Sequence, residues 1–209
     1  MTIPQVANMM SIPIGIICLL ISIRAFYIYT LSFNDMIFVL ALSMAFLTIG
    51  TFVGTIGDAH IAGNTWNVDW TRTCGACCGG IFIFLSSLAT SSQQMRKIRQ
   101  WQVMVAILFV IVIVLTPFYP SAKTPPLPLV LNSLRILIYS CAFIRYALLY
   151  NSKSTRFSSM MCIAFLVLVT GYVLNIPGIL QSSLAIFTII AAAVRMSAYV
   201  TLLAAYSVK

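Results

Sequence analysis

The sequence predicts an all-α protein: a polytopic integral membrane helix bundle with seven transmembrane helices. Of the 209 residues, 61% are hydrophobic and only 7% are charged, whereas a soluble domain carries about 25% charged residues. The apolar residues also gather into seven long runs joined by short links. These observations exclude a soluble globule, a disordered chain and a coiled coil. We therefore expect residues 1–209 to form a single transmembrane helical domain, multi-pass in the cell membrane.

Each of the seven runs has the length that a membrane-spanning helix needs. A hydrocarbon core about 30 Å thick requires roughly 20 apolar residues per helix. On that basis we expect spans over residues 6–29, 36–56, 70–91, 101–117, 128–150, 157–176 and 182–206. The third span carries a run of poor helix formers from Cys74 to Gly80, and the seventh holds Arg195 near its middle. Loss of either span would leave six helices and put both termini on one side.

Basic residues mark one side of the predicted bundle. They follow the odd-numbered spans at Arg96, Lys97, Arg99, Lys153, Arg156 and Lys209. The alternate loops hold Lys123 alone or the acidic stretch 58–69. The positive-inside rule then predicts an N-terminus outside and a C-terminus inside. Because the basic residues lie between hydrophobic runs, we expect them to contact anionic lipids at the cytoplasmic face, and not nucleic acid.

Small residues in the second and third spans predict close helix packing. The second span contains Gly50 and Gly54, and the third contains Gly75, Gly79 and Gly80. Small residues spaced by four let two helix backbones approach closely in a membrane. We expect these two helices to pack tightly, and a protein partner to dock through the same pair.

Two arginines lie well inside predicted spans, Arg195 deepest and Arg135 about two turns from one end. Intramembrane charges are costly and mark functional sites by default. The chain has no Glu, and its three acids all lie at span ends, at Asp35, Asp58 and Asp69. Arg195 therefore faces backbone carbonyls and the side chains of Thr170, Tyr172 or Asn175, a water-filled cavity, or an anionic ligand.

A third arginine, Arg72, lies just inside the start of the third span. It is three residues after Asp69, a spacing that favours a local ion pair on a helix. Arg195, Arg135 and Arg72 are the residues that we expect to bind a ligand.

The sequence contains no motif that indicates a catalytic residue, a metal ligand or a particular cofactor. There is no HExxH, GxSxG or phosphate-binding glycine loop. The single histidine, His60, has Asp58 nearby but no second ligand at metal-site spacing. Cys74 and Cys77 form a CxxC pair beside Arg72 that would suit thiol–disulfide exchange, although no second dithiol accompanies it. An enzyme is accordingly the less favoured class.

The predicted topology is similar to that of microbial rhodopsins and G-protein-coupled receptors. The resemblance is limited to topology, which carries little functional weight. A rhodopsin needs a lysine inside its last helix to bind retinal, and the seventh span here contains Arg195 and no lysine. Retinal chemistry of that kind is excluded, and no family is assigned.

Three hypotheses about function follow from these observations. The first is a sensor or receptor-like protein that binds a small anionic or amphiphilic ligand within the bundle. The second is a non-catalytic subunit of a larger membrane complex, which the short loops and small-residue faces favour. The third is an anion transporter or channel, in which helices broken near Gly79–Gly80 or Asn175–Pro177 line a path.

Overall fold

The computed structural model describes residues 9–58, 68–115, 126–181, 184 and 186–207. Within these residues the chain is almost entirely helical and has no strand, and seven helices are long and apolar enough to cross a membrane. The helices are α2 (Ser11–Ser32), α3 (Asp35–Asp58), α4 (Val68–Leu88), α5 (Ser92–Leu115), α6 (Pro126–Lys153), α7 (Arg156–Leu174), the short α8 (Ile176–Leu180) and α9 (Ile186–Ser207). The predicted fold class is confirmed, whereas the orientation of the termini stays a prediction.

Helix α5 begins nine residues before the predicted start of the fourth span. The cause is a capping arrangement in which Ser91 Oγ accepts a bond from the Gln94 N–H at 3.3 Å, while Gln94 Oε1 accepts the Thr90 N–H at 2.9 Å. Such reciprocal bonds satisfy N–H groups that a helix start leaves exposed. Arg96, Lys97 and Arg99, which we expected in a loop, consequently lie in the first two turns of α5.

The run from Cys74 to Gly80 is continuous helix inside α4, not the weak helix that its composition predicts. Tertiary packing decides this. A Cβ atom added at Gly75 would lie 2.6 Å from the Phe46 carbonyl oxygen, and one added at Gly79 would lie 2.8 Å from that of Ser43. The glycines allow α3 to approach α4 at backbone distance, and this contact outweighs their poor intrinsic propensity.

By their contacts the residues divide into two compact units, and the expectation of a single domain stays a prediction. We call Cys18–Ala122 the α3–α5 unit, because those three helices form its core. We call Met1–Ile17 together with Lys123–Lys209 the α6–α9 unit.

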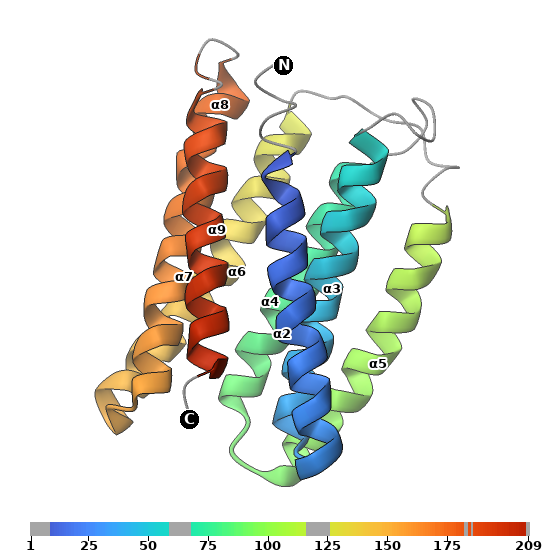
Figure 1. Ribbon diagram of the computed structural model, residues 1–209, viewed down its shortest axis with the longest axis vertical. Helices are drawn as coiled ribbons and strands as arrows, with labels where there is room; N and C mark the ends of the chain where they lie inside the picture. Colours follow the sequence, from blue (N-terminus) through green and yellow to red (C-terminus); the bar gives the residue numbers. More distant parts are fainter. Residues whose placement is uncertain (1–8, 59–67, 116–125, 182–183, 185, 208–209) are drawn as a thin grey trace. The chain divides into compact units, whose positions relative to one another are not determined.

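In the α3–α5 unit, helices α3 and α4 lie side by side (Figure 1). Gly50 and Gly75 meet at their α-carbons, so the predicted tight packing of the second and third spans is confirmed. Phe46 on α3 packs against Phe82 and Phe109, with ring centres 6.4 and 5.3 Å away. Gly50 and Gly75 therefore face each other, and docking of a partner protein on these helices stays a prediction.

In the α6–α9 unit, α7 packs against both α6 and α9. Helix α9 presents alanines to this contact, and Ala191, Ala192 and Ala198 are at most 1% exposed. Helix α7 ends at Leu174, two residues after the buried Tyr172, and α8 continues after Asn175. The break coincides with Pro177, which has no N–H to bond to the carbonyl of Val173 four residues earlier.

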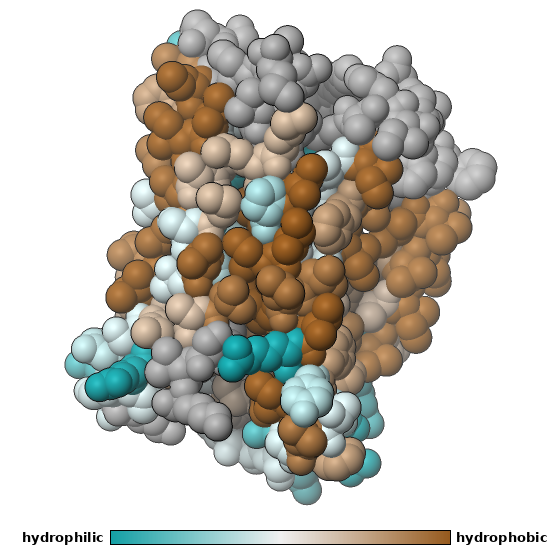
Figure 2. All heavy atoms as spheres, viewed as in Figure 1, coloured by the Kyte–Doolittle hydropathy of each residue, from teal (hydrophilic) through white to brown (hydrophobic). Residues whose placement is uncertain are grey.

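Apolar side chains cover most of the visible flanks of the helices (Figure 2). Helix α5 is the extreme case, because only 11% of its most apolar stretch is buried. Trp101, Ile107 and Val114 on this helix are each about 60% exposed. A helix apolar on its open side suits contact with lipid and not with water.

Candidate functional site

Two arginine side chains converge on one tyrosine ring in the α6–α9 unit. The guanidinium carbon of Arg195 lies 5.1 Å from the centre of the Tyr172 ring. The guanidinium carbon of Arg135 lies 5.7 Å from the same centre. Tyr172 is buried, at 4% exposure, while both arginines are half-buried. The site therefore joins side chains from α6, α7 and α9 around one aromatic ring.

Arg195 is held by its own helix and by a gap in α7. Its Nε–H donates to the Ala191 carbonyl at 3.2 Å, one turn earlier in α9. Its Cγ atom lies where Gly171 leaves room, because a Cβ added at position 171 would be 2.7 Å away. The bond to Ala191 directs the side chain toward the start of α9, the direction in which helical side chains lean.

Arg135 is positioned by the neighbouring turns of α6. Tyr139, one turn further on, is 1% exposed and stacks on Tyr172 with ring centres 5.5 Å apart. Phe165 and Tyr146 continue the stack along the α6–α7 contact, with successive centres 6.1 and 5.5 Å apart. These buried rings fix the position of Tyr172, the ring that both guanidinium groups contact.

Two asparagines lie near the end of α7, Asn132 one turn from Arg135 on α6 and Asn175 one turn from Tyr172. Asn132 on α6 donates its Nδ2–H to the carbonyl of Tyr172 at 2.9 Å. Asn175, at the break, has its Nδ2 atom 3.5 Å from Asn132 Oδ1. The Oδ1 atom of Asn175 is buried and has no hydrogen-bond partner among the described residues. Asn132 thus bonds a carbonyl beside the break, and Asn175 retains acceptor capacity.

The α6–α9 unit contains basic residues but no acidic ones. Residues 123–209 contain seven Lys and Arg and no Asp or Glu, and residues 1–17 contain neither acid. The unit itself therefore contributes no carboxylate side chain to the site. Contact with an aromatic face stabilises a cation by only about 0.5–2 kcal/mol. The arrangement is therefore suited to an anion, which guanidinium groups bind through charge-assisted hydrogen bonds.

The structure brings together two of the three arginines that we expected to bind a ligand. Arg135 and Arg195 share Tyr172, one of the three side chains expected near Arg195. Thr170, another of them, is exposed and donates to the Leu166 carbonyl in its own helix. Tyr139 and Asn132 were not expected, although their spacing from Arg135 places all three on one face of a helix.

Arg72, the third predicted ligand-binding residue, belongs to the α3–α5 unit. A Cβ atom added at Gly54 would lie 2.6 Å from Arg72 Nε, so the guanidinium group covers this glycine of α3. The side chain of Asp69, its predicted ion-pair partner, lies outside the described residues, as do His60 and Lys123. Arg72 thus reaches from α4 onto α3 at Gly54.

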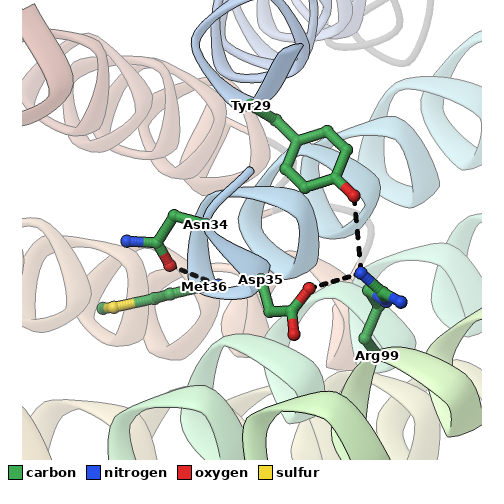
Figure 3. Close-up of polar contacts among 5 residues, drawn as sticks. All are labelled: Tyr29, Asn34, Asp35, Met36 and Arg99. Carbon is green, nitrogen blue, oxygen red and sulfur yellow. Dashed lines mark hydrogen bonds and ion pairs between the residues drawn. The ribbon is translucent and has the colours of Figure 1, made fainter. Parts of the chain in front are cut away.

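A second polar cluster in the α3–α5 unit joins three helices (Figure 3). Arg99 on α5 forms an ion pair with Asp35 at the start of α3. The same Nη1 atom donates to the Tyr29 hydroxyl at 3.4 Å, and the guanidinium carbon lies 5.8 Å from the Phe38 ring centre. The two ionic side chains are 30% and 23% exposed. This partly exposed cluster ties α2, α3 and α5 together.

The six cysteines lie on four helices. All six lie in described residues, and their thiols form no disulfide. Cys74 and Cys78 pack against the core around Phe46 and Phe82. Within the part of the chain that the structure describes, no three His, Cys, Asp or Glu side chains gather closely enough to hold a metal ion.

Comparison of the chain with protein-family models, with curated proteins and with solved structures finds no match. The class of protein accordingly rests on the fold. Seven long apolar helices define a multi-pass membrane protein. Within it, the two arginines around Tyr172 form the candidate site.

Proposed function

We propose that this protein is a membrane sensor or receptor-like protein that binds a small anionic or amphiphilic ligand between α6, α7 and α9. The observation that carries the proposal is the convergence of Arg135 and Arg195 on the Tyr172 ring in a unit without Asp or Glu. Both guanidinium carbons lie within 5.7 Å of the centre of this ring, and we propose that one anionic group interacts with both.

The depth of the site supports an amphiphilic ligand. Arg195 lies nine residues after the start of α9, about 13 Å along the helix axis. A guanidinium group in the membrane interior is costly unless hydrated or paired. A headgroup at this depth supplies the charge, and its chains extend along the apolar flanks. The rigid stack of Tyr172, Tyr139 and Phe165 holds the binding surface in place.

Native mass spectrometry in mild detergent tests this proposal with Arg195→Gln. The wild-type protein is titrated with phosphatidic acid, and with phosphatidylcholine as a lipid without net charge. We expect the wild type to prefer phosphatidic acid, and Arg195→Gln to lose about tenfold or more in affinity, because a charge-assisted hydrogen bond is removed.

The matched control is Arg156→Gln. Arg156 is the first residue of α7, is exposed, and belongs to the same unit. Its removal changes the net charge by the same amount but leaves the site intact. Equal losses in the two variants would show that binding follows net charge alone, and the proposal would then fail.

Anion transport is the second candidate function, and the helix break favours it. Asn175 and Pro177 mark the break between α7 and α8, within two turns of Tyr172. Discontinuous helices border the substrate site in many transporters. Flux of inorganic phosphate or chloride from proteoliposomes, abolished by Arg195→Gln, would favour transport. Binding without flux would favour the sensor.

A further inference from the structure

The Asn175 side chain carries an unused hydrogen-bond acceptor beside the arginine site. Its Oδ1 atom is buried and lacks a partner among the described residues. Few buried polar atoms in native proteins lack a partner, so each one needs a specific explanation. Asn175 is three residues from Tyr172 on the same helix face, about 4.5 Å along the axis.

The position of Asn175 is set by the helix break. Pro177 cannot donate a hydrogen bond, and Asn132 Nδ2–H bonds the neighbouring carbonyl of Tyr172 at 2.9 Å. Asn132 and Asn175 then meet only at 3.5 Å, the long end of hydrogen-bond geometry. This weak contact uses Asn175 Nδ2, so Asn175 Oδ1 accepts no hydrogen bond from any described residue.

The charge of the neighbourhood selects the kind of donor that fits this acceptor. An ammonium group here would lie about one helical turn from Tyr172, in a unit with seven Lys and Arg and no Asp or Glu, and like charges repel strongly at low dielectric. A hydroxyl group donates a hydrogen bond without adding positive charge. The favoured donor is therefore a neutral hydroxyl.

We infer that the ligand is a polyol phosphate, an inference that rests on the proposed function. Its phosphate meets Arg135 and Arg195, and its hydroxyl donates to Asn175 Oδ1. A hydroxyl a few bonds from the phosphate can bridge the one helical turn that separates Tyr172 from Asn175. Asn175 Oδ1 is covered in this structure, so binding requires α8, a five-residue helix joined to α7 only at Asn175, to shift slightly. A lipid with a glycerol headgroup and a soluble glycerol phosphate share this chemistry.

The test compares two lipids that carry the same charge. Phosphatidylglycerol has hydroxyl groups on its headgroup, and phosphatidylethanol has none. Binding of each to the full chain in phosphatidylcholine nanodiscs is measured for the wild type, Asn175→Leu and Arg195→Gln. We expect the wild type to prefer phosphatidylglycerol about threefold to tenfold, the effect of one hydrogen bond. Asn175→Leu should bind both lipids with the lower affinity of phosphatidylethanol.

The outcomes separate the two proposals. Equal affinities in the wild type, or an unchanged preference in Asn175→Leu, would overturn the polyol inference while leaving anion binding intact. Unchanged binding of both lipids by Arg195→Gln would overturn the proposed function itself. Should Asn175→Leu fail to fold, Asn175→Ala removes the same acceptor and makes the same comparison.

Soluble probes distinguish the two sources of the ligand. Glycerol 1-phosphate and inorganic phosphate are added as competitors against bound phosphatidylglycerol. Displacement by glycerol 1-phosphate at lower concentration than by inorganic phosphate supports recognition of the hydroxyl and indicates a soluble polyol phosphate. Displacement by neither, with the lipid preference retained, supports the same headgroup chemistry on a lipid. Equal displacement by both would contradict the inference.

Discussion

The side chain of Arg195 passes over the α-carbon of Gly171, so that a methyl group at position 171 would lie 2.7 Å from Arg195 Cγ. Such a distance does not occur between real carbon atoms in contact, and the arginine would have to move. Helix α7 thus lacks a side chain at the one point where the stem of Arg195 crosses it. The position of the guanidinium group over Tyr172 depends on this gap.

We predict that Gly171→Ala displaces Arg195. The free energy of unfolding in mixed micelles should fall by about 1–3 kcal/mol, as for other overpacked sites, and phosphatidic acid binding should weaken severalfold. In the double variant Gly171→Ala with Arg195→Ala, the clash is removed and part of the stability should return. Strictly additive losses in this mutant cycle would show that the two residues do not interact.

The glycines between α3 and α4 predict a graded response to added methyl groups. At Gly75 the added carbon would lie 2.6 Å from a backbone oxygen of Phe46, whereas at Gly50 the nearest atom, the Thr71 carbonyl oxygen, is 3.1 Å away. Gly75→Ala should therefore lower the free energy of unfolding by about 1–3 kcal/mol, and Gly50→Ala by less. A reversed order would contradict the backbone contact at Gly75.

Two substitutions of Gln102 of similar size should have very different effects on stability. It is fully buried, and its Nε2–H groups donate to the Val39 carbonyl at 2.8 Å and to Ser43 Oγ at 2.9 Å, while Oε1 has no partner among the described residues. Gln102→Met removes an unsatisfied acceptor along with these bonds, so stability should change by less than about 1.5 kcal/mol.

Gln102→Glu has almost the same shape but places an ionisable group at this buried position. It should destabilise the protein by several kcal/mol, because burial of an uncompensated charge is costly. Thermal unfolding in detergent compares both variants with the wild type. Equal stability of the Met and Glu variants would mean that water reaches this position.

The ion pair of Arg99 with Asp35 predicts a modest, salt-sensitive contribution to stability. Both side chains are partly exposed, and partly exposed pairs contribute about 0.2–1 kcal/mol. Asp35→Asn should lower the free energy of unfolding by about this amount, and the difference from the wild type should shrink at high salt. Arg96→Gln, in the same turn region of α5, serves as the control for a change of charge alone. An equal loss from Arg96→Gln would argue against a specific pair.

The sequence predicted more of the fold than of the site. All seven spans were identified because hydrophobic length is a local property that the bilayer thickness fixes. Their ends were less certain. The start of α5 was placed too late because the capping bonds of Ser91 and Gln94 lie in a polar stretch that carries no hydropathy signal.

The site was predicted as single residues and not as an arrangement. Arg135 and Arg195 stood out because charge is rare inside apolar runs. Arg72 was selected by the same rule, yet it covers Gly54 between α3 and α4. Rarity of charge identifies an unusual residue but does not say what it contacts.

By itself the sequence determined the all-helical class, the number of spans and the excess of basic residues in the C-terminal half, since each depends on composition and on order along the chain. Tertiary structure alone decided that Arg135 and Arg195 share the ring of Tyr172 and that Gly171 makes room for one of them. These residues lie on three different helices. Their meeting depends on how helix faces pack, and residue spacing within one helix carries no information about that.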